Sequence, residues 1–137
     1  MPEIDWDRLH EAAVGALAHA YVPYSHFRVG AAALTDDGRV VTGANIENAS
    51  YPVTNCAETA LVSELWMGAE VGSTPRLVAF ACVDGRGNAL MPCGRCRQLL
   101  FEHSAPGMLL ATVSGIRTID EVLPDAFGPR TLEAYRG

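Results

Sequence analysis

The sequence predicts an α/β fold: a three-layer α/β/α sandwich around a mixed, mainly five-stranded sheet. Two observations predict it. Segments with apolar residues at helical spacing alternate along the chain with short segments typical of strands. In the middle of the chain the order is strand, helix, strand, helix, strand, which implies parallel strands with helices packed on the sheet. A chain of 137 residues without a linker or repeat is expected to form a single domain, residues 1–137.

The first third of the chain is expected to form a helix followed by a β-hairpin. Asp5 begins the helix, which ends before Pro23. The residues that share its apolar face are Trp6, Leu9, Ala13, Leu17 and Ala20. Residues 28–35 and 39–44 then form two strands, because the turn sequence Asp36-Asp37-Gly38 lies between them.

Helices and strands alternate in the rest of the chain. A helix is expected at 55–68, followed by a buried strand at 76–83 that is almost continuously apolar. The remaining elements are a short strand at 88–91, a helix at 94–103 and a strand at 108–113. Thr118 and Glu121 have the spacing of a capping box, which predicts a last short helix.

Composition limits the classes of partner. The formal net charge is -6 and the basic residues form no cluster, which argues against nucleic acid as a partner. No stretch approaches the ~20 apolar residues of a membrane span, so no membrane association is expected. The amino terminus, with Glu3, Asp5 and Asp7, lacks the basic and apolar regions of a signal peptide. We therefore expect a cytoplasmic location, where cysteines stay reduced.

The most informative motifs are Cys56-Ala57-Glu58 and Pro92-Cys93-Gly94-Arg95-Cys96. Thiolates from Cys56, Cys93 and Cys96 fill three positions of a zinc tetrahedron, and a catalytic site leaves the fourth position to water. Cys56 and Cys93 are each expected at a helix N-terminus, where the helix dipole lowers the pKa of a thiol. Glu58 is placed to exchange protons with the water without becoming a ligand. The sequence therefore predicts one catalytic Zn²⁺ per subunit.

Other interpretations of these cysteines are open at this point. A CxxC pair alone is more often a structural zinc knuckle or a redox pair than a catalytic site. Cys82 is a competing ligand, since a fourth thiolate would give a closed structural site without chemistry. Its place in the apolar run 77–83 favours instead a buried strand, in which free cysteine behaves as a small hydrophobe.

Three further segments resemble cytidine deaminases of the small, homotetrameric, three-cysteine type. Residues 21–32 (YVPYSHFRVGAA) resemble the family's first active-site loop, 43–51 (GANIENASY) its nucleoside-binding segment, and 123–128 (LPDAFG) its carboxyl-terminal aromatic motif. The resemblance implies hydrolytic deamination of cytidine and 2'-deoxycytidine in pyrimidine salvage. It also implies a homotetramer with shared active sites, in which Tyr51 and Phe127 reach into a neighbouring subunit's pocket.

The resemblance assigns roles to further residues around a small-molecule nucleoside. Phe27 is expected to pack against the pyrimidine, and Asn45 and Glu47 to hydrogen-bond the ribose 3'-hydroxyl. Ala57 is expected to position the base through its backbone. Glu58 is the expected catalytic residue, which takes a proton from the zinc-activated water, delivers it to N3 of the ring and later protonates the leaving amine.

One position departs from the pattern of the family. Many such enzymes carry an arginine directly after the catalytic glutamate, where this chain has Thr59. Three thiolates leave Zn²⁺ with a net negative charge, which raises the pKa of its water. We hypothesise that Arg95, between the two cysteines of the second motif, supplies the missing positive charge, with Arg97 as the next candidate.

Two other functions stand as alternatives. The first is deamination of another cytosine-bearing small molecule of the blasticidin S type, although the segment Asn45-Ile46-Glu47-Asn48 suits an ordinary nucleoside. The second is a non-catalytic structural zinc module, in which Glu58 would be idle. Cytidine monophosphate is a less suitable substrate, because no Lys/Arg cluster accompanies the pocket motifs.

Overall fold

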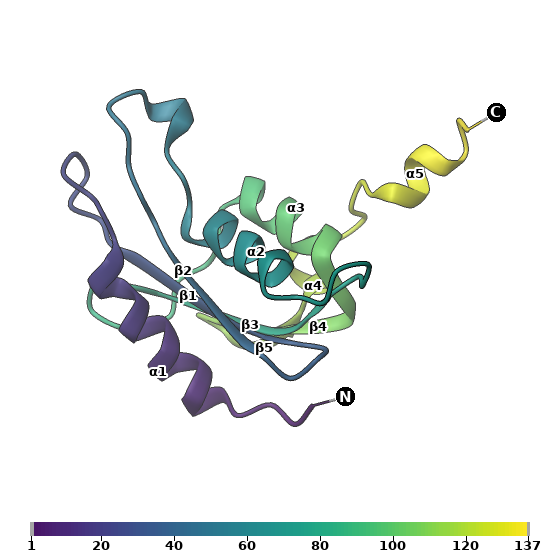
Figure 1. Cartoon of the computed structure of the whole chain (residues 1–137), viewed down its shortest axis with the longest axis horizontal. Helices are drawn as coiled ribbons and strands as arrows, with labels where there is room; N and C mark the ends of the chain where they lie inside the picture. The colour runs from purple at the N-terminus through teal and green to yellow at the C-terminus, as the bar shows by residue number, and fades with distance from the viewer. Residues whose placement is uncertain (1, 137) are drawn as a thin grey trace.

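The computed structural model describes residues 2–136 as a five-stranded sheet with helices on both faces (Figure 1). Helix α1 lies against one face, and α2 and α3 lie side by side over the other. The predicted three-layer α/β/α arrangement is thus confirmed. In chain order the elements are α1 (Trp6–Ala16), a 3-10 turn (Leu17–His19), β1 (Val29–Thr35), β2 (Val40–Ala44), a 3-10 turn (Tyr51–Val53), α2 (Ala57–Met67), β3 (Leu77–Asp84), α3 (Gly94–His103), β4 (Ser104–Thr112), β5 (Gly115–Thr118), α4 (Ile119–Val122) and α5 (Pro129–Glu133).

The sheet is mixed, with the strand order β2-β1-β3-β4-β5. Strand β1 is antiparallel to both β2 and β3, β4 is parallel to β3, and β5 is antiparallel to β4. Strands β2, β3 and β4 therefore point the same way, as the alternation of strands and helices predicts, although only β3 and β4 are direct neighbours. Because α2 follows β2 and α3 follows β3, both helices begin at the same edge of the sheet.

The predicted strand at 88–91 is wrong. In this segment Ala89 forms only an isolated bridge with Val83, flanked by the bonds from Asp84 N to Asn88 O and from Leu90 N to Cys82 O. Pro92 follows directly and has no N–H to donate to a ladder. The fifth strand is instead β5. It has only four residues, too few to show a period in the sequence.

Two other elements differ from the prediction. Strand β4 begins at Ser104 rather than at residue 108, and its pairing with β3 shifts register between the Leu77 and Ala79 pairs. Pro106 and Gly107 lie in this irregular stretch, and they hide the start of the strand from a search for regular alternation. Helix α5 was not predicted, whereas the capping box of Thr118 at the start of α4 was.

Alternation along β1 and β3 divides the core between the two faces of the sheet. Ala31 and Ala33 of β1 belong to the cluster beneath α2 and α3, together with Phe80 of β3. Ala32 and Leu34 belong to the cluster beneath α1. Because successive side chains of a strand point to opposite faces, one nearly continuous apolar strand supplies both layers of core.

Two glycines allow the helices to approach the sheet closely. A Cβ added at Gly30 of β1 would lie 2.1 Å from the carbonyl oxygen of Ala13 in α1. A Cβ added at Gly43 of β2 would lie 2.2 Å from the carbonyl oxygen of Ala57 in α2. Both atoms belong to backbone, which cannot turn aside as a side chain can. The first turn of α2 therefore rests directly on β2.

The longest helices, α1 and α2, have 11 residues each. Within residues 2–136 none combines the length and the apolar character that crossing a membrane requires.

We expect Gly30→Ala and Gly15→Ala to change stability in opposite directions. The first substitution places a methyl group against the Ala13 carbonyl and is expected to cost about 1–3 kcal/mol. The second lies on α1, where an added Cβ meets nothing within 4 Å, and is expected to stabilise by about 0.5–1 kcal/mol. Urea unfolding at one fixed protein concentration measures both. Equal stability of the two variants would contradict the close approach of α1 to β1.

Candidate active site

A pocket of about 290 Å³ lies at the edge of the sheet where α2 and α3 begin. It brings together seven of the residues singled out from the sequence: Phe27, Asn45, Cys56, Ala57, Glu58, Cys93 and Cys96. The other lining residues are Cys82, weighed above as a competing ligand, Pro92 of the second motif, and four that were not expected there: Val29, Thr54, Leu90 and Met91. Glu47, Tyr51, Phe127 and Arg95 do not line it.

Each of the four unexpected residues lies within three positions of a residue or motif named from the sequence. Thr54 precedes Cys56 by two positions, and Met91-Pro92 leads directly into Cys93. Closeness to a motif in the sequence is the one feature that could have predicted their place in the pocket. It is a weak feature, because residues in short connections carry no chemical signature of their own.

Cys56 and Cys93 are the N-cap residues of α2 and α3, and both have extended backbone conformations. Neither side chain makes a capping hydrogen bond. A helix N-terminus carries about half a positive charge, which favours a thiolate. Cys96 lies in the first turn of α3 and is fully buried. All four cysteines of the chain are free thiols.

The thiol of Cys96 lies close to the other titratable groups of the pocket. Burial raises its pKa, and the neighbouring Glu58, Cys56 and Cys93 act in the same direction. Within residues 2–136, no three His, Cys, Asp or Glu side chains already stand together as a metal-binding group. Cys56, Cys93 and Cys96 nevertheless line one pocket. Three thiols are a donor set that suits Zn²⁺ and leaves its fourth position to water, beside the Glu58 carboxyl group.

Glu58 is held in the first turn of α2 and is 6% exposed. Its carboxyl group lines the pocket beside the cysteines. A buried carboxyl group needs polar partners, and a metal site with its water supplies them. The burial of Glu58 therefore suits a group that exchanges protons inside the pocket rather than a solvated surface residue.

Cys82 reaches the pocket wall from β3, and its thiol is already engaged. Its S–H donates to the carbonyl oxygen of Leu90 at 2.9 Å, and the Leu90 N–H donates to the Cys82 carbonyl at 3.0 Å. Burial raises the pKa of this thiol, and the charge of Glu58 raises it further. The bond to Leu90 would have to break before Cys82 could bind a metal, whereas the raised pKa is shared with Cys96 and does not distinguish the two thiols. This geometry favours the buried free cysteine over a closed four-cysteine site.

A guanidinium group lies against the first cysteine of the site. Arg95 Nη1 is 3.7 Å from Cys56 Sγ. Arg97 instead donates to two carbonyl oxygens, those of Pro92 at 2.8 Å and Val122 at 3.2 Å. The Thr59 hydroxyl is buried without a hydrogen-bond partner among residues 2–136. Of these three candidates for compensating thiolate charge, Arg95 is the one that contacts a thiol of the pocket.

Asn45 holds Phe27 in the pocket wall. Its Nδ2 donates to the Phe27 carbonyl at 2.8 Å, and its Oδ1 accepts from the Val29 N–H at 2.9 Å. The Phe27 side chain is 43% exposed and lines the pocket beside Asn45. The amide expected at the sugar therefore also fixes the residue expected at the base.

Glu47 binds the same loop further along. Its carboxylate accepts from the backbone N–H groups of Tyr24 at 3.0 Å and Ser25 at 3.1 Å, and from the Ser25 hydroxyl. The Ser25 hydroxyl lowers the pKa of Glu47 most, and the two N–H groups lower it further. Two backbone bonds join the segments as well, since Tyr21 N donates to Asn45 O at 2.9 Å and Glu47 N donates to Tyr21 O at 2.8 Å.

Tyr51 and Phe127 lie on the surface of their own chain. They are 72% and 57% exposed, respectively. The Tyr51 ring lies edge-on to Tyr24 with centroids 6.3 Å apart, and the Phe127 carbonyl accepts from Gln98 Nε2 at 2.7 Å. Within one chain, therefore, neither aromatic ring contributes to the pocket.

A model of the zinc-binding region of cytidine and deoxycytidylate deaminases matches residues 4–112. The chain belongs to this family. A curated relative is the cytidine deaminase of Mycobacterium tuberculosis, 55% identical over 128 residues, which are 93% of each chain. The cytidine deaminase of Halalkalibacterium halodurans is 44% identical over 131 residues, 90% of this chain and 95% of the relative.

Solved structures in the family share the fold. The crystal structure of the M. tuberculosis cytidine deaminase matches with a TM-score of 0.85 and 54% identity, covering 92% of this chain and 99% of that one. The cytidine deaminase of Burkholderia pseudomallei matches with a TM-score of 0.75 and 42% identity, covering 90% and 100%. The matched region of the family is a zinc-binding region, and the three-thiol pocket of this chain fits Zn²⁺ as its cofactor.

Proposed function

We propose that this chain is a zinc-dependent cytidine deaminase, which converts cytidine and 2'-deoxycytidine with water into uridine or 2'-deoxyuridine and ammonia, in pyrimidine salvage. One observation supports it most strongly: a single pocket is lined by three thiols, a buried carboxyl group and an aromatic side chain. Family membership and relatives named cytidine deaminase support the same activity.

Each residue of the pocket has a task in this reaction. Cys56, Cys93 and Cys96 hold one Zn²⁺ per subunit, which when bound activates water as a Lewis acid near neutral pH. Glu58 accepts a proton from the attacking water and donates it to N3 of the pyrimidine as the new C4–O bond forms. It then takes the remaining proton of the C4 hydroxyl and delivers it to the amine, so that the C4 carbonyl forms as the C4–N bond breaks and ammonia leaves. The burial of Glu58, which is 6% exposed, limits the contact of its carboxyl group with bulk water. The Ala57 backbone helps to orient the base.

The nucleoside is held by the loop that Asn45 and Glu47 organise. Phe27 packs against the pyrimidine, while Asn45 and Glu47 bind the ribose 3'-hydroxyl. Their present bonds leave capacity for this, because a carboxylate and an amide each have more hydrogen-bonding positions than these contacts occupy. The binding contacts and the loop contacts are then made by the same two side chains.

We further propose that the chain works as a single domain, residues 1–137, in a cytoplasmic homotetramer with shared active sites. The exposure of Tyr51 and Phe127 supports the sharing, because both rings are available to a neighbouring subunit. Arg95 offsets the charge of the zinc thiolates, and its contact with Cys56 Sγ supports that role.

The activity is tested with purified protein and Glu58→Gln. We expect ammonia release from cytidine and 2'-deoxycytidine but little from cytosine or cytidine monophosphate. Glu58→Gln should lower kcat roughly 10³-fold with unchanged zinc content, because the glutamate moves protons without binding metal. Zinc content is measured by emission spectrometry. A parent protein that holds zinc but releases no ammonia from any cytosine compound would favour the structural zinc module. Parental turnover in Glu58→Gln would contradict the acid-base role.

The charge of Arg95 is tested by zinc affinity. Arg95→Gln should weaken zinc binding about tenfold in competition with a chelator, because an outer partner of a metal thiolate is lost. Thr59→Arg in the same chain should restore most of the affinity. Arg8→Gln, an exposed arginine on α1, is the control for overall charge. Unchanged affinity in Arg95→Gln would leave the helix N-termini as the main compensation.

Shared active sites are tested by mixing two defective variants. Phe127→Ala should raise KM for cytidine about tenfold, because an aromatic contact with the nucleoside site is lost. Tyr135→Ala, an exposed aromatic near the carboxyl terminus, serves as the control. The Phe127→Ala and Glu58→Gln variants are then mixed so that their subunits exchange. A fraction of the sites should then combine Glu58 from one subunit with Phe127 from another, and these sites should show the parental KM. No such sites after confirmed exchange would contradict the shared arrangement.

A further inference from the structure

The loop between α1 and β1 carries Phe27 into the pocket in a conformation that needs support. His26, directly before Phe27, has a φ of 58°, in the left-handed region that residues other than glycine rarely adopt. Such a conformation is strained and persists where its surroundings enforce it. The contacts of the neighbouring residues therefore determine where the Phe27 ring lies.

On the pocket side, support comes from residues already described. The Asn45 amide binds the Phe27 carbonyl and the Val29 N–H, and the Ser25 hydroxyl accepts from the Phe27 N–H at 3.0 Å. These bonds fix the backbone immediately around Phe27. They do not connect the loop to α1, from which the loop departs.

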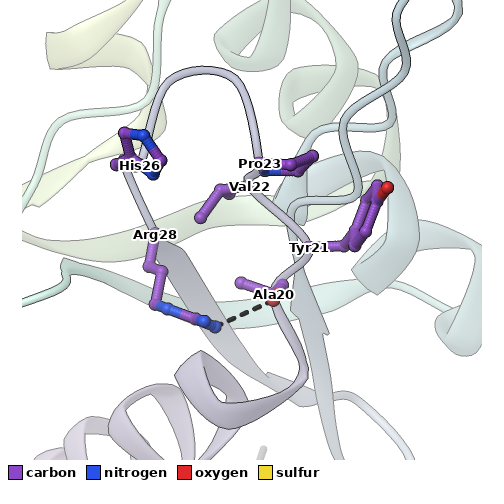
Figure 2. A pocket seen from close by; sticks show the side chains of 6 residues that line it. All are labelled: Ala20, Tyr21, Val22, Pro23, His26 and Arg28. Carbon is purple, nitrogen blue, oxygen red and sulfur yellow. Dashed lines mark hydrogen bonds between the residues drawn. The ribbon is translucent and has the colours of Figure 1, made fainter.

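Arg28 makes that connection. Its Nη1 donates to the carbonyl oxygens of Leu17 at 3.0 Å and Ala20 at 2.8 Å, and Figure 2 shows the bond to Ala20. These carbonyls end the helical segment, where the helix dipole is negative and a cation is favoured. The last turn of α1 has no basic residue, and the 3-10 turn that continues it has only His19. Arg28 therefore adds a guanidinium charge at this helix end from the far side of the loop.

Arg28 acts outside the pocket that holds the cysteines. It borders a separate cavity of about 340 Å³, together with residues 20–23 and His26, and the two cavities have no lining residue in common. Figure 2 shows the loop arching over this cavity, with the Arg28 side chain reaching back toward Ala20 beneath it. The guanidinium thus joins the two ends of the loop, and Phe27 is the residue directly before Arg28.

We propose that Arg28 is a positioning residue for the nucleoside site: by fastening the residue after Phe27 to the end of α1, it sets the position of the Phe27 ring against the pyrimidine. The inference rests on the proposed function for its effect on substrate. Its effect on the loop is independent of that function.

The first test is kinetic. Arg28→Gln should raise KM for cytidine about tenfold with a smaller change in kcat. The reason is that the charged hydrogen bonds from Arg28 to Leu17 and Ala20, which fix the residue after Phe27, are lost. Arg28→Lys keeps the charge and a donor at the helix end and should recover much of the parental KM. Arg86→Gln is the control, an exposed arginine whose side chain makes no hydrogen bond or ion pair within residues 2–136.

A double-mutant cycle separates positioning from general destabilisation. If Arg28 acts through the ring of Phe27, Arg28→Gln should raise KM far less in a Phe27→Leu background than in the parent. A merely structural role predicts equal effects in both backgrounds. Additive effects would therefore overturn the proposal.

The second test reads the loop directly. Hydrogen-deuterium exchange of peptides covering 21–28 should quicken in Arg28→Gln and not in Arg86→Gln, with the exchange of β3 unchanged in both. Unchanged exchange in 21–28 would overturn the proposal, whatever the chain deaminates. Faster exchange without any deamination by the parent protein would uphold the fastening of the loop and contradict the proposed function alone.

Discussion

Strand direction is the constraint on which the site depends. Strands β2 and β3 point the same way with β1 reversed between them, so the ends of β2 and β3 and the start of β1 meet at one edge of the sheet. Helices α2 and α3 begin at this edge with Cys56 and Cys93 at their N-caps. Phe27 arrives there from the loop before β1. Two helix dipoles then present their positive ends to one small pocket, where thiolates are favoured.

The close packing of the fold also shapes the pocket. Gly43 lets the first turn of α2 rest on β2, and that turn carries Glu58. On the other face, Gly30 lets α1 approach β1, and the end of α1 supplies the carbonyls that Arg28 binds. Both contacts are made by backbone, so the distances between the sheet and these helix ends are fixed with little freedom. The packing of the helices on the sheet therefore helps to set the dimensions of the pocket.

Much of this arrangement could be predicted from the sequence, because its causes are local. Cap residues and apolar spacing located α2 and α3, and motif spacing placed Cys56, Cys93 and Glu58 in one pocket. Strand β5 was missed, because four residues carry no measurable period. Arg28 was missed for a different reason, since hydrogen bonds to backbone carbonyls leave no pattern in the sequence.

The aromatic and acidic residues taken from the family resemblance show a further limit of prediction. Tyr51 and Phe127 lie outside the pocket of their own chain, so a single chain does not reveal their contacts. Glu47 binds the backbone of Tyr24 and Ser25 rather than lining the pocket. Its proposed role at the sugar and its observed role in the loop are carried by one carboxylate, which motif spacing alone could not show.

The bonds between residues 21–29 and 45–47 have a consequence for how this site can be altered. Backbone bonds and two polar side chains, Asn45 and Glu47, tie these segments into one structural unit. An engineered change of substrate scope that transplants one segment alone would leave unmatched partners in the other. Segments grafted as a pair keep the bonds between them, while Arg28 and Ile46 still need their partners Leu17, Ala20 and Asn55 outside the pair. For directed evolution, the two segments are therefore best diversified together.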